Sequence, residues 1–249
     1  MKILSGIFLL TVIVVFSAKA QYTRYGTIEF ERKANVHRQM EDMMKEGDNW
    51  FEKIKSQIPK FNVSYFDYSF TTDHSIYKPG REDESQKKMR MFGAAPAADN
   101  IVYTNFKTQK ITARKNVFEE QFLVQDSLQH FRWKILDEVR MIANYKCRKA
   151  LTVINDSVVV VAFYTDDIMV SGGPELFSGL PGMILEIAIP RLHTIWIATK
   201  IDLPLPAAAV FEVPQKGTKL TQDELYDRLI KSVSRWGNWG SRSIWWSML

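Results

Sequence analysis

Short segments in which apolar and polar residues alternate run through most of the chain. In residues 25–34, Ile28 and Phe30 alternate with Glu29 and Glu31, a pattern typical of a strand with one buried face. Further strand patterns lie at 61–72, 74–79, 100–106, 110–118, 121–126, 130–136, 183–189 and 193–202, and residues 139–165 predict two strands that turn at Asn155–Asp156. About ten short strands with short connections predict one antiparallel sheet that curls into a half-open barrel or a sandwich.

Two segments carry apolar residues at helical spacing instead. The first, residues 35–58, begins at Asn35 as a helix N-cap and has the stripe Val36, Met40, Met43, Met44, Trp50, Phe51, Ile54 and Ile58. The second, residues 221–235, opens with a capping box of Thr221 and Glu224 and carries Leu225, Leu229 and Val233. We expect both helices to cover the sheet, with helix 35–58 across its concave face. Residues 80–99 lack periodicity, which predicts a mobile surface loop.

The first twenty residues have the pattern of a cleaved signal peptide. Lys2 precedes an apolar run from Ile7 to Phe16, and Ala18-Lys19-Ala20 forms a small-residue cleavage site. The alternative is a membrane anchor, but the run is well short of the roughly 20 residues that span a bilayer. We therefore expect export to the periplasm, the outer-membrane periphery or the medium, with no membrane-spanning segment after cleavage. The mature chain divides into one β-rich domain, 21–235, and a Trp-rich tail, 236–249.

Charge and cysteine content exclude some partners and bonds. Of the 33 Lys and Arg residues, Lys2 and Lys19 lie in the leader, which leaves 31 against 28 acidic residues. This balance disfavours nucleic acid, whose partners need a concentrated basic face. The single cysteine, Cys147, excludes an internal disulfide. Cys147 lies on the apolar side of the alternating stretch 139–148, which predicts a buried, inert thiol rather than a reactive one.

A short glycine-bracketed motif separates two of the expected strands: Gly179-Leu180-Pro181-Gly182-Met183-Ile184. Pro181 followed by Gly182 suits the centre of a type II turn, where glycine accepts a positive φ. A nucleophile elbow needs its serine between the glycines and a helix after it, whereas Ser178 precedes the first glycine here and a strand follows. A phosphate loop needs a helix and usually a lysine. The motif therefore predicts a structural corner.

Residues 162–187, which contain this motif, resemble the signature segment of the GLPGLI family of exported proteins from Gram-negative bacteria, with Met183 in place of the family's leucine. Residues 145–150, Tyr-Lys-Cys-Arg-Lys-Ala, resemble the family's Gly-Tyr-x-Cys-x-Lys-Ala segment, with Asn144 in place of its glycine. Asp166-Asp167 replaces the more usual Pro-Glu. The family has no known function. The resemblance implies export and a β-rich domain, and it supplies no catalytic residues.

No metal, cofactor or catalytic site follows from the remaining residues. His37, His74, His130 and His193 are far apart in the sequence. His37 with Met40, Met43 and Met44 could bind Cu(I), but these methionines serve better as the apolar stripe of their helix. Asp166, Asp167 and Glu186 could supply paired carboxylates, yet adjacent strand residues point to opposite faces. We predict no catalytic pair.

Two groups of residues are candidates for a ligand or partner surface. In the hairpin 183–202, Met183, Leu185, Ile187 and Ile189 with Ile195, Ile197 and Ile201 predict a core face. The other face carries Glu186 and Trp196, which become cross-strand neighbours if the turn centres on residue 191, on an outer surface or a groove wall. The tail carries Trp236, Trp239, Trp245 and Trp246 with two arginines. It either docks back on the sheet or meets a membrane interface or a protein partner.

By analogy of fold alone, we expect an exported, non-catalytic binding or accessory protein whose ligand is an apolar small molecule or an outer-membrane protein. This hypothesis predicts an interior with few ionisable groups. The alternatives are an envelope hydrolase, which would gather at least two ionisable side chains in a cleft, and an accessory subunit that docks through the Trp-rich tail.

Overall fold

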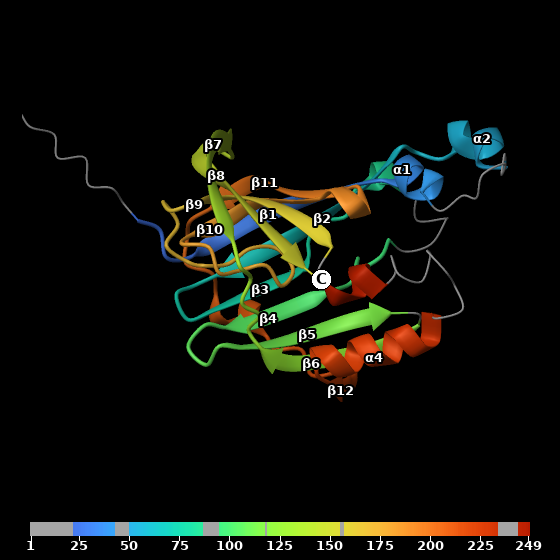
Figure 1. Ribbon diagram of the computed structural model, residues 1–249. Helices are drawn as coiled ribbons and strands as arrows, with labels where there is room; N and C mark the ends of the chain where they lie inside the picture. The colour runs from blue at the N-terminus through green and yellow to red at the C-terminus, as the bar shows by residue number, and fades with distance from the viewer. Residues whose placement is uncertain (1–21, 43–49, 87–94, 118, 155–156, 234–243) are drawn as a thin grey trace, which may run out of the picture.

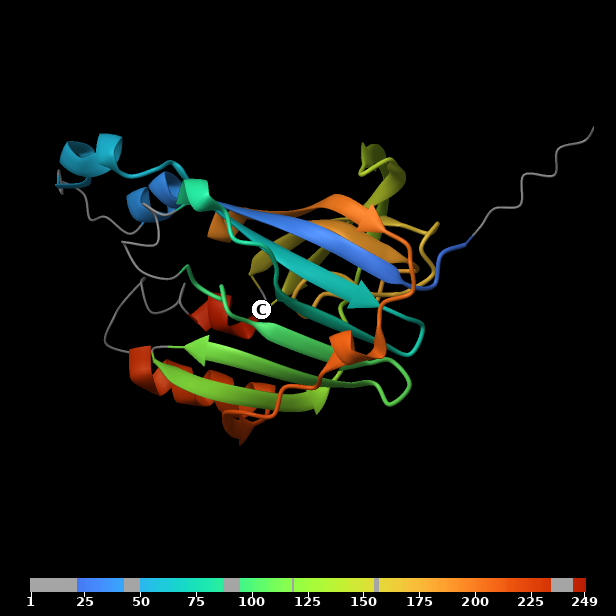
Figure 2. The ribbon, with the colours of Figure 1, turned by 180° about the vertical axis from the view of Figure 1, so that it is seen from behind.

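A computed structural model describes residues 22–42, 50–86, 95–117, 119–154, 157–233 and 244–249. The predicted signal peptide and residues Trp236 and Trp239 lie outside these ranges. Within them, twelve strands form one sheet (Figures 1 and 2). The strands are β1 (Gly26–Asn35), β2 (Phe61–Phe70), β3 (His74–Pro79), β4 (Ile101–Asn105), β5 (Lys110–Val117), β6 (Glu120–Ser127), β7 (Lys134–Ile142), β8 (Tyr145–Ile154), β9 (Val158–Thr165), β10 (Met183–Ile189), β11 (Thr194–Asp202) and β12 (Thr218–Leu220).

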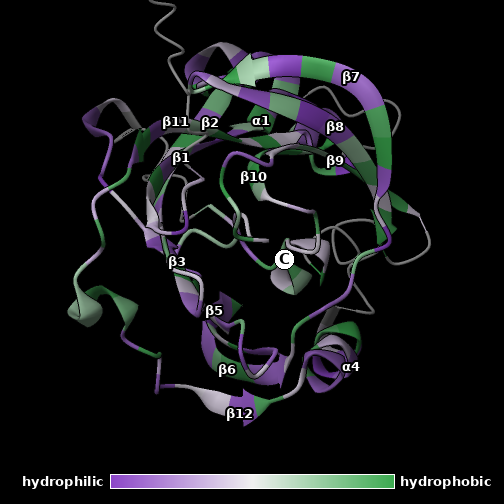
Figure 3. Cartoon of the chain, turned by 90° about the vertical axis from the view of Figure 1, so that its left-hand side faces the viewer, coloured by the Kyte–Doolittle hydropathy of each residue, from purple (hydrophilic) through white to green (hydrophobic). Residues whose placement is uncertain are grey.

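The sheet is curled but not closed. Its strand order is β12-β6-β5-β4-β3-β2-β1-β11-β10-β9-β8-β7, so β12 and β7 are its two edges. Figure 3 looks along the resulting trough, with the last residues of the chain in its middle. The prediction of a mainly β fold with a curled sheet is confirmed, but a sandwich is not. The sheet is also mixed rather than purely antiparallel, because β12 pairs with β6 in the parallel direction.

The concave face of the sheet holds the core, because apolar and polar side chains alternate along the strands and the apolar ones point to this face. In β1, Ile28, Phe30, Arg32 and Ala34 are buried, while the residues that alternate with them are partly exposed. Their neighbours in β2 continue the same face, since Phe30 lies opposite Phe66. Ala162 on β9 and Ile187 on β10 continue this face on the far side of β1.

One predicted strand is in fact a hairpin. Residues 139–154 were expected to be continuous, but β7 ends at Ile142 and β8 begins at Tyr145. Ala143 and Asn144 form the turn, with φ values of 47° and 68°. Both lie in the left-handed region, which suits the two-residue turns that join twisted strands. The sequence hides this turn because it contains neither glycine nor proline.

The helix predicted across the concave face is not there. The structure has α1 (Val36–Glu41), then α2 (Trp50–Ile54) and the short 3₁₀ turn η1 (Lys55–Gln57), all beyond the ends of β1 and β2 (Figure 1). Val36, Phe51 and Ile58 form a small apolar cluster of their own, separate from the main core. The described part of the predicted stripe is therefore buried within this small cluster rather than in the main core of the sheet.

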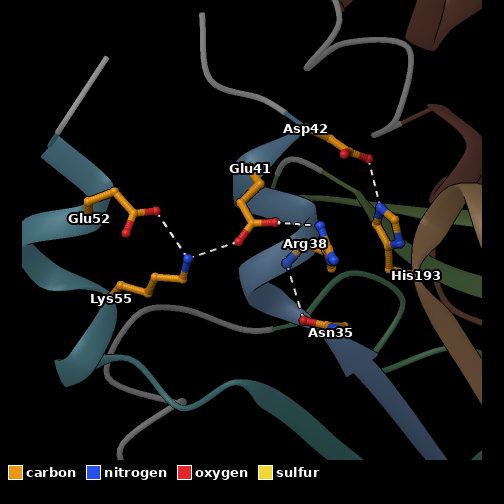
Figure 4. A network of polar contacts seen from close by, with 7 residues as sticks. All are labelled: Asn35, Arg38, Glu41, Asp42, Glu52, Lys55 and His193. Carbon is orange, nitrogen blue, oxygen red and sulfur yellow. Dashed lines mark hydrogen bonds and ion pairs between the residues drawn. The ribbon is translucent and has the colours of Figure 1, made fainter. Parts of the chain in front are cut away.

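Polar contacts hold this region together (Figure 4). Asn35 caps α1 by accepting a hydrogen bond from the main-chain N–H of Arg38 at 3.2 Å, as predicted. Lys55 joins the two helices through Glu41, at 3.0 Å. The ring of His193, from the turn after β10, contacts Asp42 at 2.7 Å.

The second predicted helix is confirmed as α4 (Gln222–Val233). The side chain of Glu224 accepts a hydrogen bond from the main-chain N–H of Thr221 at 2.7 Å, and Thr221 Oγ1 accepts one from Glu224 N at 3.2 Å, the two bonds of a capping box. The buried side chains of Leu225 and Leu229 join the main core, and the helix lies alongside β6 (Figure 1). Further 3₁₀ turns are η2 (Glu84–Gln86), η3 (Pro190–Leu192) and η4 (Ala208–Phe211).

In the part of the chain that the structure describes, no helix has the length and apolar character needed to cross a membrane. Of the loop predicted at 80–99, residues 80–86 and 95–99 are described, and they include the turn η2.

Candidate functional site

The Gly179–Ile184 motif contains a turn that is tighter than the type II turn expected from its sequence. Gly182 N donates a hydrogen bond to Leu180 O at 2.8 Å, which makes a three-residue γ-turn centred on Pro181. The φ values of Gly179 and Gly182 are 92° and 156°. At Gly182 space is the stronger constraint, because any side chain there would collide with the main-chain carbonyl of Thr165 at the end of β9.

The corner ends a buried loop, residues 166–182, that packs into the trough of the sheet. Ile168, Val170, Leu176 and Phe177 from this loop belong to the main core. Glu175, at the loop's innermost turn, is 3% exposed and has a φ of 54°. This left-handed conformation is uncommon for a residue other than glycine, so the surrounding contacts must hold it in place.

Glu175 belongs to a group of ionisable side chains inside the trough. Asn100 Nδ2 donates a hydrogen bond to Glu175 Oε2 at 3.0 Å. Burial raises the pKa of Glu175, although Asn100 and the positive charges of Arg32 and Lys115 act in the opposite direction. Lys115 is 1% exposed, and burial lowers its pKa to about 8. The expectation of an interior with few ionisable groups is therefore wrong.

Residues 244–249 cover these ionisable side chains. Residues 244–248 are helical and lie in the middle of the trough (Figure 3). Lys115 Nζ donates hydrogen bonds to the main-chain oxygens of Ser247, at 2.9 Å, and of Leu249. The guanidinium of Arg32 lies 5.5 Å from the centre of the Trp246 ring. The described part of the Trp-rich tail thus docks back on the sheet.

The two hairpin residues expected on a surface are both buried. Trp196 is on the inner face, where its indole N–H donates a hydrogen bond to the hydroxyl of Tyr77 at 3.2 Å. Glu186 is 2% exposed and forms an ion pair with Arg140 of β7. They are not cross-strand neighbours, because Glu186 lies opposite Ile197 and Ile187 lies opposite Trp196.

That register differs by one residue from the predicted one because the turn has four residues. The turn η3 is followed by His193 in a left-handed conformation, with a φ of 48°. Strand β11 therefore begins one position later relative to β10 than a turn centred on residue 191 allows. A single-residue shift moves each side chain to the opposite face, which carries Trp196 inward.

Cys147, His37 and His74 each contact neighbouring residues of the fold. Cys147 is fully buried and unpaired, and burial raises the pKa of its thiol to about 12, so the prediction of a buried thiol is confirmed. The ring of His37 contacts Ile58 O at 2.8 Å, and that of His74 packs edge-on to Phe211. Among the described residues, no three His, Cys, Asp or Glu side chains are grouped as metal ligands. Met43 and Met44 lie outside these residues.

An accessible concavity lies elsewhere, where the segment before β1 meets the hairpin turn of β7 and β8. This end groove is half-open, encloses about 490 Å³ and is lined by Tyr22, Thr23, Arg24, Tyr25, Asn144, Tyr145, Asp167 and Leu203. Its volume falls within the roughly 300–1,000 Å³ typical of small-ligand sites. Tyr22 and Tyr25 are 57% and 44% exposed, so both rings are accessible from the groove side or from solvent.

Main-chain contacts fix the walls of the end groove. Thr23 N donates a hydrogen bond to Asp167 O at 3.0 Å, and Met169 N donates one to Thr23 O at 2.9 Å. Asp167 follows the strand end that packs against Gly182, so the motif supports this wall. Burial raises the pKa of the Tyr145 hydroxyl, and the nearby carboxylate of Asp167 adds to this effect.

A second and smaller groove, of about 350 Å³, lies on the outside of β3–β5 under residues 209–216. Its lining includes Lys78, Arg114 and Glu212 and no aromatic side chain among the described residues.

Sequence reasoning missed both the interior group and the end groove. The sequence does contain a signal for the interior group of charged residues. Arg32 follows Ile28 and Phe30 on one face of β1, and Lys115 follows Ile111 and Ala113 on one face of β5. A charge in such an apolar row is normally paired or hydrogen-bonded inside the protein. The end groove has no comparable signal, because its residues come from four separate segments.

Comparison with known proteins supports the fold and gives no activity. A family model described as "Protein of unknown function (Porph_ging)" matches residues 151–186, which run from β8 into β10 and include the motif. A search of the curated proteins finds no match. Two solved structures of PNGF-II, in the P21 and C2 space groups, superpose with TM-scores of 0.52 and 0.53 at 15% and 17% identity.

These alignments cover 79% and 84% of this chain but only 32% and 33% of the PNGF-II chains. The chain therefore spans about one third of the length of the proteins that it resembles. At such identities the likeness concerns the fold alone.

Proposed function

We propose that this chain is an exported, non-catalytic binding protein and that the end groove is its ligand site. The observation that carries this proposal is the exposure of Tyr22 and Tyr25 beside Arg24 and Asp167 in an open concavity. Aromatic faces next to a few polar groups are typical of ligand sites. Export rests on the pattern of residues 1–20.

Non-catalytic binding is favoured over hydrolysis because of where the ionisable groups lie. Arg32, Lys115 and Glu175 converge, but each is at most 3% exposed and residues 244–249 cover them. A substrate could not reach these side chains without displacing that segment. An apolar carrier is also disfavoured, because the same charged groups and the segment 166–182 occupy the trough.

The resemblance to the GLPGLI family is part of this proposal. The motif Gly179–Ile184 lies inside the segment that matches a family of unknown function, and its corner supports the wall of the end groove. An accessory role is the second candidate. It is favoured by the likeness to one third of PNGF-II, which indicates that this fold can be one part of a longer chain.

Two experiments test the proposal. N-terminal sequencing of the protein from periplasmic and outer-membrane fractions should find Gln21 as the first residue, and an intact leader in the cytoplasm would contradict export. A thermal-shift screen of the mature chain against small-molecule fractions of envelope extracts should find stabilising fractions. Tyr25→Ala should lose this stabilisation, whereas Tyr226→Ala, a similarly exposed tyrosine on α4, should keep it. Equal responses of both variants would contradict the end groove as the ligand site.

A further inference from the structure

We propose that the end groove binds an uncharged saccharide, whose rings stack on Tyr22 and Tyr25 and whose hydroxyl groups bond to Arg24, Asn144 and Asp167. This inference rests on the proposed function and specifies its ligand class.

The two exposed tyrosines provide flat apolar surfaces. A sugar ring has one face of C–H groups, which packs on an aromatic ring while the hydroxyl groups around its edge stay free to bond. Tyr22 and Tyr25 flank Thr23, whose main-chain bonds to Asp167 and Met169 anchor the segment to the end of the sheet. These bonds hold the backbone between the two rings, so a ligand that covers the rings does not also have to order this segment.

The polar side chains of the groove are the types that bond pairs of neighbouring hydroxyl groups. A carboxylate, an amide and a guanidinium are each planar and present two adjacent hydrogen-bonding atoms. Within the described residues, the side chains of Arg24, Asn144 and Asp167 show no hydrogen bond or ion pair to the protein. Their bonding capacity is therefore left for a ligand or for solvent.

The charge of the groove selects against other ligand classes. Arg24 and Asp167 contribute one positive and one negative charge, so the lining has no excess of either sign to hold an ion. An apolar ligand that covered them would leave both charges desolvated and unpaired, which is unfavourable. A polar, uncharged ligand satisfies both groups at once, and the groove volume of about 490 Å³ admits a short oligosaccharide.

The geometry of the opposite wall supports the same ligand class. Asn144 sits in the left-handed turn between β7 and β8, which directs this wall toward the segment 22–25. Tyr145 follows it, and its hydroxyl lies close enough to Asp167 for the carboxylate to raise its pKa. At neutral pH this hydroxyl stays protonated and can donate a hydrogen bond to a sugar oxygen.

Isothermal titration of the mature full-length chain with uncharged trisaccharides tests the inference. The probes are cellotriose, maltotriose and tri-N-acetylchitotriose, with a neutral tripeptide and decanoate as probes of other classes. We expect at least one trisaccharide to bind. Tyr25→Ala and Tyr22→Ala should each weaken that binding by at least about tenfold, since each removes a stacking surface.

Two further variants keep the test independent of folding. Asp167→Asn keeps the shape of the side chain, and Arg24→Gln keeps much of its length; both should weaken saccharide binding with an unchanged melting temperature. Tyr226→Ala is the matched control, because Tyr226 is 38% exposed and lies on α4, and it should bind as the wild type does.

The outcomes separate this inference from the proposed function. If no trisaccharide binds while the tripeptide or decanoate binds in a Tyr25-dependent way, the saccharide inference is overturned and the end groove remains a ligand site. If trisaccharides bind equally well to both tyrosine variants, the inference is overturned because the sugar lies elsewhere. If no probe binds and the extract screen is also negative, both proposals fail.

Discussion

Gly182 lies directly against the main-chain carbonyl of Thr165, so closely that no side chain fits between them. This contact joins the start of β10 to the end of β9, two residues before Asp167, which lines the end groove. A motif that resembles a catalytic loop in its glycine content thus acts by close backbone packing.

We expect Gly182→Ala to destabilise the fold by about 3 kcal/mol or more, because the new Cβ must displace buried backbone. Gly179→Ala is the matched variant. Its added Cβ meets nothing closer than the Trp133 indole at 3.6 Å, so only the φ of 92° opposes it, at a cost of about 1 kcal/mol. Urea unfolding of the two variants measures the difference, and equal losses would contradict the packing argument.

Trp246→Ala should cost about 3–5 kcal/mol, as expected when a large buried side chain is removed. Trp246 is 4% exposed, its ring centre lies 5.9 Å from that of Trp196, and it packs on Arg32. Trp245 is only partly buried, so Trp245→Ala should cost less. Denaturant unfolding monitored by circular dichroism compares them. A negligible loss for Trp246→Ala would mean that the tail is not docked in solution.

Lys115→Met should change how stability depends on pH. The folded-state pKa of about 8 lies below the ordinary value of 10.5, so the folded protein holds its proton less tightly than the unfolded chain. Burying the charge is therefore unfavourable below pH 8, and this cost disappears as the pH rises from 8 to 10.5. The wild type should gain up to roughly 3 kcal/mol relative to the variant across that window. Parallel stability curves would show that Lys115 is not a buried cation.

Arg140→Met should leave Glu186 as an unpaired buried carboxylate. We expect a loss of about 2–3 kcal/mol, less than the roughly 3–5 kcal/mol for a fully buried pair, because the Arg140 side chain is 40% exposed. Adding Glu186→Gln to this variant should recover part of the loss. Arg148→Met, at an exposed position of the adjacent strand, should stay within about 0.5 kcal/mol of the wild type. If the second substitution recovers nothing, the ion pair is not the cause.

Local patterns in the sequence were enough to predict most of the strands and one helix, but not the hairpin turn at Ala143–Asn144 or strand β12. Alternation located β1 and β5, and a capping box located the start of α4. Such patterns reflect neighbours along the chain, which periodicity records directly. Helix 35–58 failed because its apolar stripe is genuine but packs on itself: Val36, Phe51 and Ile58 meet across two short helices.

Features that depend on distant segments could not be predicted. The parallel pairing of β12 with β6 and the approach of Glu175 to Arg32 and Lys115 join parts of the chain that share no local pattern. The prediction that Trp196 lies on the outer face was wrong for a local reason. One left-handed residue in the turn, His193, reverses the faces of the strand that follows.

The position of β1 in the middle of the sheet has a consequence for how the protein assembles. Strands β2–β6 and β8–β11 each pair with the strand before them in the sequence, so both halves, β1–β6 and β7–β11, can form from local hairpins. Only the pairing of β1 with β11 joins the halves along the sheet, and it must wait until residues 194–202 have been synthesised. Until then β1 keeps one unpaired edge, a state that invites aggregation. Strand β1 is thus made early, but one of its edges stays unpaired until β11 is made. During that interval the unfinished chain must be kept from aggregating.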